Sequence, residues 1–527
     1  MRGISMRENR EVPCLLVGVI TGRAAQERLR PHTWDERARE VRQLRSTDEA
    51  AEQGFGRGGG GGKGAGRGEH GRLDMPRTQS RARRAKRAGP CEVARKDKDA
   101  RFTALLHHVD LDRLRAAYWA INPKAATGMD GMTWGTYGQD LEANLRDLHA
   151  RVRTGRYQAR PSRRAYIPKT DGRLRPLGIA ALEDKIVQRA VVEVLNAVYE
   201  EDFLGFSYGF RPGRSPHDAL DALAAGIYKK NVNWVLDADI RDFFSSLDRA
   251  WLSKFVEHRV ADKRVLRLID KWVSAGVIED GSWSDPLEGV PQGASASPLL
   301  ANIYLHYVFD RWVRQWRRRH ARGDIIVVRF ADDFIVGFQH LGDAKQFLHD
   351  LHERFAKFGL ELHPDKTRLI RFGRFAASNR AERGLGKPET FDFLGFTHIC
   401  GKGRSGSFWL RRITIARRLR AKLKQVKDQL ERRRHLPVPE QGRWLASVVR
   451  GHLAYYAVPG NGRAANAFRI QVSRHWLRAL RRRSQRHRLT WERMNRLSAR
   501  WLPPVRVLHP YPEVRFDVRT QGRSPVR

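Results

Sequence analysis

The stretch Ile325-Ile-Val-Val-Arg-Phe-Ala-Asp-Asp-Phe-Ile-Val-Gly-Phe338 decides how the rest of the chain is interpreted. Two apolar runs rich in β-branched residues flank Ala331-Asp332-Asp333, a pattern typical of two strands joined by a tight turn. The segment therefore predicts a β-hairpin with two adjacent carboxylates at its tip. Because aspartates in turns usually serve only the turn, this pair alone indicates no chemistry.

A second segment gives the aspartate pair a chemical meaning. The run from Trp234 to Phe244 (WVLDADIRDFF) predicts another strand that ends in acids, Asp239 among them, followed by two aromatic residues. Two-metal nucleotidyl transfer requires carboxylates from different strands that converge on ions ~4 Å apart. One ion lowers the pKa of the primer 3′-hydroxyl, and the other holds the triphosphate and the leaving pyrophosphate. A strand-end aspartate opposite a hairpin pair satisfies this requirement.

Seven short motifs, in their order along the chain, resemble those of reverse transcriptases, in particular the proteins encoded by bacterial group II introns. Each motif is weak alone, but their common order makes coincidence negligible, and the resemblance runs from about Leu105 to Asp517. The motifs are Tyr166–Ile179, Tyr208–Gly213, Asp239–Phe244, Gly289–Leu305, Phe330–Asp333, His363–Thr367 and Phe393–Phe396.

The resemblance implies an α+β fold of the right-hand polymerase type, in which fingers and a palm with an antiparallel sheet precede an α-helical thumb or maturase domain. It implies RNA-directed DNA polymerase activity with Mg²⁺ and dNTPs. Asp239, Asp332 and Asp333 match the catalytic, metal-binding triad of the family. The positions that match nucleotide-binding residues are Lys169, Arg175, Phe244, Gln292 and Lys366. Among these, the aromatic ring would exclude a 2′-hydroxyl, and the basic groups would grip phosphates.

The sequence also departs from the family pattern. Asp242 stands where group II proteins usually have glycine, Ser245 where they have aspartate, and Arg249 where histidine is common. The Ala294–Ser297 stretch lacks a bulkier apolar pair. None of these changes removes a metal ligand, but they motivate a second hypothesis, a splicing chaperone whose polymerase has decayed. A third is a domesticated enzyme of a retron, a diversity-generating element or a defence system.

The charge of the chain points to nucleic acid. One hundred Lys and Arg against 58 Asp and Glu give a net charge of +42, and no segment is apolar enough to anchor in a bilayer. Basic residues concentrate after residue 411, where aromatic residues interleave with them. Gly451–Ala457 and Arg481–Gln485 resemble the maturase domain, which argues against the third hypothesis. The candidate RNA-binding residues are Arg481, Arg482, Arg483, Tyr455 and Tyr456.

The expected organisation has five parts. They are a disordered Gly/Arg-rich segment over 1–99, a helical extension of the fingers over 100–149, the reverse transcriptase region over 150–397, the maturase domain over 405–510 and a tail over 511–527. The His509–Asp517 ending has no His-Asn-His arrangement or paired cysteines, so no nuclease domain is expected. The expected partners are group II intron RNA, an RNA template with a DNA primer, and target DNA, in the bacterial cytoplasm as a ribonucleoprotein and without a membrane.

Overall fold

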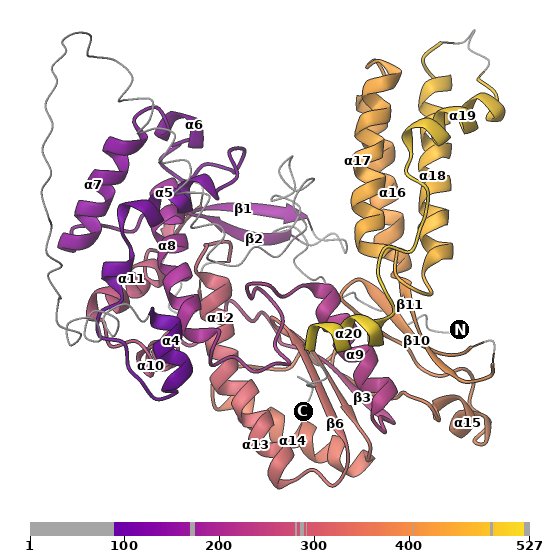
Figure 1. The fold of residues 1–527 in the computed structure, drawn as a ribbon, viewed down its shortest axis with the longest axis horizontal. Coiled ribbons are helices and arrows are strands. Elements are labelled where there is room, and N and C mark those ends of the chain that lie inside the picture. The colour runs from indigo at the N-terminus through magenta and orange to yellow at the C-terminus, as the bar shows by residue number, and fades with distance from the viewer. Residues whose placement is uncertain are drawn as a thin grey trace, which may run out of the picture.

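The computed structural model describes residues 89–168, 174–279, 282–284, 289–290, 292–403, 405–484 and 489–520. The fold is α+β, with helices around three sheets (Figure 1). Among the described residues, no helix is both long enough and apolar enough to cross a membrane. The helices before the central sheet are α4 (Pro90–Lys96), η1 (Leu106–His108), α5 (Leu111–Trp119), α6 (Trp134–Tyr137), α7 (Leu141–Thr154), α8 (Leu182–Tyr199) and α9 (Pro216–Lys229).

Helical structure begins before residue 100, where the sequence predicts the first helical region. Helix α4 lies within the segment expected to be disordered up to residue 99. Proline suits the first turn of a helix, and the negative charge of Glu92 in that turn interacts favourably with the positive end of the helix dipole. The rest of that prediction concerns residues 1–88, which lie outside the described residues. The helical spacing around Leu105–Tyr118 divides into η1 and α5, because the side chain of Asp110 caps a new helix start.

A four-stranded antiparallel sheet forms the centre of the molecule. Its strand order is β6-β7-β3-β8, and the strands are β3 (Trp234–Asp239), β6 (Ile325–Phe330), β7 (Asp333–Phe338) and β8 (Arg368–Arg371). Alternate residues of a strand face opposite sides of a sheet. One face, with Leu236, Val327 and Val336, belongs to the larger core; the other, with Val235 and Ile335, belongs to a second core.

Each face of the central sheet is covered by different elements. The larger core receives residues of α12 (Ser297–Leu305), α13 (Arg311–Arg319) and α14 (Leu341–Ala356). The second core receives α9 and the three-stranded sheet β11-β10-β9. That sheet is built from β9 (Phe391–Phe393), β10 (Phe396–Lys402) and β11 (Phe408–Thr414).

A third sheet lies on the N-terminal side of the molecule (Figure 1). Its order is β2-β1-β4-β5, from β1 (Ser162–Pro168), β2 (Leu174–Ile179), β4 (Val277–Glu279) and β5 (Ser282–Ser284). Strands β1 and β2 pair antiparallel, while β1 and β4 pair in parallel. The remaining described helices before residue 400 are α10 (Arg249–Glu257), α11 (Lys263–Val273), the π-helical η2 (His306–Asp310) and α15 (Ala376–Ala381).

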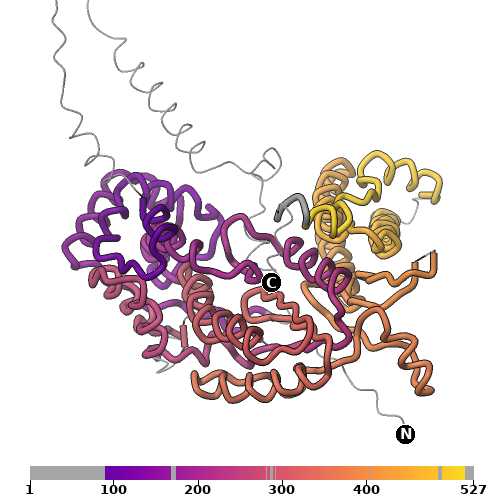
Figure 2. Tube along the Cα trace, turned by 60° about the horizontal axis from the view of Figure 1, so that its bottom comes forward, coloured from indigo at the N-terminus to yellow at the C-terminus, as the bar shows by residue number. Residues whose placement is uncertain are grey.

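The chain after β11 is helical, as the hydrophobic stripes predict. Its helices are α16 (Ala416–Arg432), α17 (Val438–Tyr456), α18 (Gly462–Arg481), α19 (Trp491–Trp501) and α20 (Pro512–Thr520). The first four share a core of their own, and Figure 2 shows this part beside the central region and away from the N-terminal helices. Helix α20 falls in the predicted tail but packs on α9, where the buried Asp221 pairs with Arg412 of β11 and with Arg515 of α20.

Candidate active site

The predicted hairpin with two carboxylates at its tip is present. Every residue of β6 and β7 is buried, and Phe330 pairs with Asp333, so Ala331 and Asp332 alone form the turn. Ala331 has a φ of +57°, a left-handed conformation that costs a non-glycine residue about 1–2 kcal/mol. A Cβ added to Gly209 would lie 2.3 Å from the Ala331 nitrogen, so the 209 backbone supports the turn directly.

Asp239 and Asp333 lie directly opposite each other on neighbouring strands. Strand β3 ends at Asp239, and its antiparallel register with β7 pairs that residue with Asp333. Side chains of directly opposed residues share one face of a sheet, with Cβ atoms about 4.5–5.5 Å apart. The alternation places both carboxylates on the α9 face, opposite the face that α12 to α14 cover. The structure therefore brings together the strand-end and hairpin aspartates that the sequence singled out.

Lys366 joins this group. Its Nζ donates to Asp239 Oδ2 at 3.0 Å, and both side chains are largely buried. The turn that carries the lysine is fixed to the strand end, because the amide of His363 donates to the carbonyl of Asp239 at 2.8 Å. The site thus pairs a carboxylate with an ammonium group.

Burial, and to a lesser extent the negative charge of Asp239, raise the pKa of Asp332 to about 6. A backbone hydrogen bond and the charges of Arg175 and Lys366 act in the opposite direction. Burial is the larger cause because it disfavours the charged carboxylate, and repulsion from the nearby Asp239 carboxylate adds to it. The same electrostatic relationship shows that Arg175, on β2, is close enough to act on the aspartates.

Arg329 supports the hairpin from inside and was missed by the sequence analysis. Its guanidinium is fully buried and donates to both carboxylate oxygens of Asp310, at 2.7 and 2.6 Å. It also donates to Asn302 Oδ1 and to the carbonyl of Ala331, each at 3.0 Å. The sequence did contain a signal for this residue, since an arginine inside an otherwise apolar strand is expected to be buried and therefore to need a charged or polar partner.

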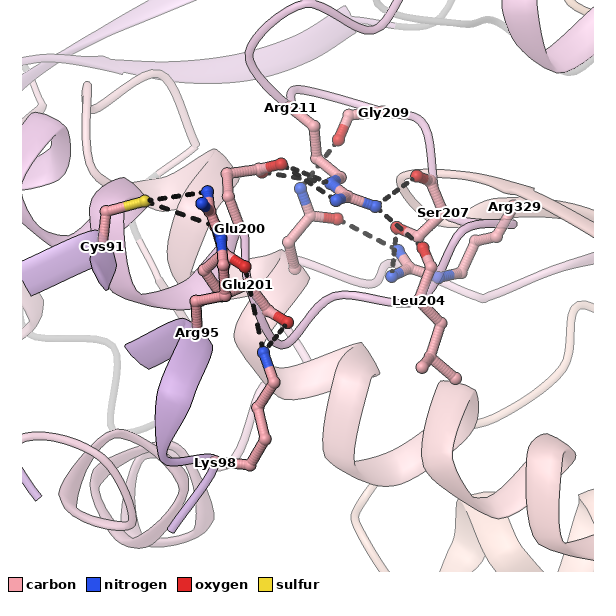
Figure 3. Close-up of polar contacts among 11 residues, drawn as sticks. Cys91, Arg95, Lys98, Glu200, Glu201, Leu204, Ser207, Gly209, Arg211 and Arg329 are labelled. Atoms are coloured by element: carbon pink, nitrogen blue, oxygen red, sulfur yellow. Dashed lines mark hydrogen bonds and ion pairs between the residues drawn. The ribbon is translucent and has the colours of Figure 1, made fainter. Parts of the chain in front are cut away.

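A second buried arginine fixes the loop behind the turn. Figure 3 shows Arg211 beside Glu200, with its guanidinium donating to the carbonyls of Leu204 and Ser207 at 2.8 Å each. Ser207 also accepts from Arg329 through its hydroxyl at 2.7 Å. The two arginines therefore hold one loop, which in turn lies against the aspartate turn.

The backbone of Phe244 is hydrogen-bonded to the motif that begins at Gly289. The amide of Val290 donates to the carbonyl of Phe244 at 2.9 Å, and a Cβ at Gly289 would lie 2.8 Å from that carbonyl oxygen. Gly289 also has a φ of +88°, so glycine is required there on both counts. The Phe244 ring is half-buried and packs edge-on against the buried Phe243.

The structure connects Gln292 to the sheet that carries Arg175. The carbonyl of Gln292 accepts from the amide of Gly178 on β2 at 2.7 Å. The 289–293 motif therefore runs between the Phe244 backbone on one side and β2 on the other. Lys169, the remaining nucleotide-binding candidate, lies outside the described residues.

The departure at residue 242 has a conformational explanation. Asp242 is exposed and has a φ of +40°, and its carbonyl accepts from the amides of Ser245 and Ser246. A left-handed residue in a tight turn favours glycine, and aspartate is among the residues that tolerate it best. The substitution therefore keeps the turn at a modest conformational cost.

The five predicted RNA-binding residues differ in their surroundings. Tyr455 donates to the carbonyl of Leu394 at 2.8 Å, and its ring stacks on Phe396; Tyr456 packs against the same phenylalanine. Both tyrosines are half-buried, so they join α17 to the β9–β11 sheet rather than offer free stacking faces.

Two of the three arginines also make backbone contacts. Arg481 donates to the carbonyl of Leu489 at 2.9 and 2.8 Å, and Arg483 donates to the carbonyls of Arg434 and Leu436. Arg482 retains 65% side-chain exposure and lies 3.6 Å from Glu431. Arg481 and Arg482 are both exposed and Arg483 is half-buried, and the guanidinium of Arg482 lies beside a carboxylate rather than a backbone carbonyl.

The aspartate group has the donor chemistry of a metal site but is not assembled as one. Within the described residues, no group of three acidic, histidine or cysteine side chains stands ready at metal-binding positions. The donor chemistry nevertheless fits a hard cation, because carboxylate oxygens are its preferred ligands and the charge repulsion at Asp332 calls for a positive charge. Lys366 supplies part of that charge at Asp239.

Comparison with known proteins identifies a domain in this chain. Residues 167–398 match the family model described as reverse transcriptase (RNA-dependent DNA polymerase), a stretch that contains all three aspartates. The match identifies residues 167–398 as a reverse transcriptase domain. Domains of this family generally depend on divalent metal ions.

The similar curated proteins include a group II intron-encoded protein and an intron maturase. The chain is 36% identical over 239 residues to protein YkfC of Escherichia coli strain K12, covering 40% of this chain and 62% of that protein. It is 35% identical over 182 residues to group II intron-encoded protein LtrA of Lactococcus lactis subsp. cremoris, covering 34% and 30%. It is also 26% identical over 164 residues to nuclear intron maturase 3, mitochondrial, of Arabidopsis thaliana, covering 31% and 21%. The chain thus spans 62% or less of the length of these relatives.

Proposed function

We propose that this protein is an RNA-directed DNA polymerase that adds dNTPs to a primer 3′-hydroxyl by two-metal nucleotidyl transfer. The observation that carries the proposal is the pairing of Asp239 with Asp333 on one face of the central sheet, with Asp332 in the adjacent turn. Carboxylates from two strands meet there, beside Lys366 and within the electrostatic reach of Arg175.

In this proposal Asp239, Asp332 and Asp333 would hold Mg²⁺, which would activate the attacking hydroxyl and neutralise the triphosphate. Lys366, which is paired with Asp239, would offer its ammonium group to a phosphate oxygen of the triphosphate. Arg175 offers a planar guanidinium for bidentate phosphate contacts. Phe244 would place its ring beside the sugar and exclude a 2′-hydroxyl.

The proposal divides the chain as a right hand. The central sheet with α12 to α14 is the palm, the β2-β1-β4-β5 sheet with the preceding helices is the fingers, and α16 to α19 form the thumb. In this division, residues 100–149 extend the fingers, residues 150–397 form the fingers and the palm, and residues 405–510 form the thumb. Residues 511–527 differ from a simple tail in that α20 docks on α9.

We further infer that the thumb binds group II intron RNA and assists its splicing. Arg420, Lys424 and Lys427 are exposed on α16 at helical spacing, which gives that helix a basic face. Such a face suits a phosphate backbone. The intron RNA, an RNA template with its DNA primer, and target DNA are the proposed partners, met in the bacterial cytoplasm as a ribonucleoprotein.

The test of the polymerase is Asp332→Asn, which removes a negative charge with little change in volume. We expect primer extension to be lost while circular dichroism and the unfolding temperature show an intact fold. Asp270→Asn, at an exposed position on α11, is the matched control and should extend normally. Normal cDNA yield from a folded Asp332→Asn protein would exclude the assignment.

A splicing chaperone with a decayed polymerase is the competing hypothesis, motivated by Asp242 and Ser245. Its test is Asp242→Gly, because glycine relaxes the left-handed backbone at that position. A large gain in extension rate would support decay at this turn. Activity that is already robust in the unaltered protein and unchanged by glycine would exclude the chaperone.

A further inference from the structure

An arginine-rich groove lies along α13, outside the site described above. A hollow of about 700 Å³ is lined by this helix together with parts of α10, η2 and α14. Arg311, Arg314, Arg318 and Arg319 line it, as do Gln315 and Trp312. None of the described residues that line the hollow carries a carboxylate.

Three arginines of this groove carry exposed charges. Arg311, Arg314 and Arg318 are exposed, and none of them forms an ion pair with a carboxylate of the described residues. Their spacing of three and four residues puts them on one helix face over ~10 Å of helix length, at ~1.5 Å per residue. On the opposite face of the helix, Val313 and Trp316 enter the core. The charges are therefore held on a rigid helix and remain unneutralised.

The groove faces away from the aspartates. Helices α13 and α14 cover the sheet face that carries Leu236 and Val336, whereas Asp239 and Asp333 are on the other face. In Figure 1, α13 also lies at the opposite end of the molecule from α16 to α19. A polyanion in this groove would consequently be distinct from a primer–template at the carboxylates and from RNA on the thumb.

We propose that the α13 groove binds the backbone of a structured RNA at a bulged or looped nucleotide. Guanidinium groups match phosphate oxygens bidentately, and three of them at this spacing can face successive phosphates. Trp312 lines the same hollow and is half-buried, with its ring packed against Phe347, so an unstacked base would meet the exposed part of an aromatic ring beside the charges. The inference adds a second RNA contact and does not depend on polymerase activity.

The recessed shape favours RNA over duplex DNA. Reading the major groove of DNA requires a helix that protrudes, whereas here the surface is hollowed. RNA loops and bulges splay bases that can stack on aromatic rings or guanidinium planes, which matches a hollow with both. Duplex DNA would have to unstack a base to fill the same space.

The experiment compares two full-length variants that each lose three positive charges. Arg311→Gln, Arg314→Gln and Arg318→Gln together neutralise the groove. The control combines Lys263→Gln, Arg267→Gln and Lys345→Gln, three exposed positions on other surfaces that form no ion pair within the described residues. Each protein is titrated with a bulged RNA hairpin, a fully paired RNA duplex and a DNA duplex at several salt concentrations.

The groove variant should bind the bulged hairpin at least about tenfold more weakly, and the slope of log affinity against log salt should fall by ~2 units or more, at ~0.7–0.9 per lost phosphate contact. The control should lose much less, and the groove variant should retain extension on a simple primer–template. Equal losses of RNA affinity in both variants would show that only the net charge of the protein matters, and would overturn the proposal. If the groove variant lost as much or more affinity for the DNA duplex, the assignment to RNA would be overturned. If it bound all three probes as the unaltered protein does, the proposal that the groove binds nucleic acid would be overturned, and a protein partner would remain. The polymerase assignment is tested separately by Asp332→Asn, which should leave hairpin binding intact.

Discussion

Lys366 Nζ lies 3.0 Å from Asp239 Oδ2, and the backbone of the lysine turn is hydrogen-bonded to the same strand end. The pair is largely buried, so its attraction is weakly screened by salt. It places the lysine where a triphosphate would approach the carboxylates. A positive charge held there before substrate arrives lowers the cost of keeping three aspartates together.

The first prediction concerns Lys366→Met. Removing the ammonium should raise KM for dNTPs more than it lowers kcat, because the triphosphate loses a contact while the ligands of the metal ions remain. Lys366→Arg should retain part of the affinity, since a cation is preserved. Steady-state extension kinetics at saturating divalent metal would measure both values; an unchanged KM would place the lysine in a purely structural role.

The second prediction concerns the free energy of unfolding of Asp332→Asn. The pKa of Asp332 is about 6 in the folded protein against an ordinary value of 3.8 for aspartate, so the folded state binds the proton more tightly than the unfolded state. Stability is therefore lost as pH rises from about 4 to 6, and the loss is complete above 6. Asparagine removes this cost, and we expect the variant to be more stable at pH 8 by up to about 2–3 kcal/mol, at about 1.4 kcal/mol per pKa unit. At pH 4 the difference should vanish; a pH-independent difference would contradict the electrostatic cause.

The same residue limits the polymerase at low pH. Because the aspartate must lose its proton to bind a cation, extension should rise between about pH 5 and 7 at low divalent metal concentration. Higher metal concentration should shift this rise to lower pH. A rise that does not respond to metal would assign the titration to another group.

How far the sequence predicts this site depends on whether the determinants are local. The hairpin and the strand ending at Asp239 follow from alternating apolar residues, and the structure contains both. The pairing of Asp239 with Asp333 was reached through a chemical requirement rather than a pattern, because strand register over 94 residues leaves no local trace. Arg329 was missed for the same reason: its partner Asp310 lies in a π-helix 19 residues earlier, a geometry that helical periodicity does not predict.

For the C-terminal region, the sequence predicts the helices but not the contacts that their side chains make. The stripes on α16 to α18 predict the helices well, since their period is the period of burial. They do not tell a charge that contacts backbone from one that meets solvent. Arg481 and Arg482 are neighbours in sequence and both are exposed, yet the guanidinium of Arg481 donates to the carbonyl of Leu489, whereas that of Arg482 lies beside Glu431. Nor did composition indicate that α20 would dock through Arg515.

The third prediction concerns the Arg329–Asp310 pair. Both side chains are fully buried, so Asp310→Asn or Arg329→Met leaves a charge without its partner and should destabilise the protein by about 3–5 kcal/mol. The double variant Arg329→Met with Asp310→Leu should be less destabilised than the sum of the two single changes. Chemical denaturation gives these values, and strict additivity would contradict direct coupling of the pair.

The fourth prediction concerns the choice of sugar. Phe244→Val should raise rNTP incorporation relative to dNTP, because the smaller side chain opens space beside C2′. Phe244→Tyr retains the ring and should retain discrimination. The ratio of kcat/KM for the two sugars measures the effect. If valine left this ratio unchanged, the steric role would belong elsewhere, and the adjacent Phe243, which is buried, would need testing by a conservative change.

The last prediction separates RNA binding from folding in the arginine triplet after α18. Arg482→Gln should leave the unfolding temperature nearly unchanged and reduce the salt dependence of intron RNA binding by ~0.7–0.9 log unit, as expected for one phosphate contact. Arg481→Gln should instead lower stability by about 1–3 kcal/mol, because its charged hydrogen bonds to the carbonyl of Leu489 are lost.

Thermal unfolding and salt-dependent binding, measured on both variants, distinguish the two roles. Arg483 contacts the carbonyl of Arg434 as Arg481 contacts that of Leu489, so neutralising all three arginines together would confuse lost structure with lost affinity. If Arg482→Gln bound and spliced intron RNA with the affinity, salt slope and efficiency of the unaltered protein, this surface would not contact the RNA. The maturase function would then have to rest on the basic face of α16, where Arg420, Lys424 and Lys427 offer the corresponding test.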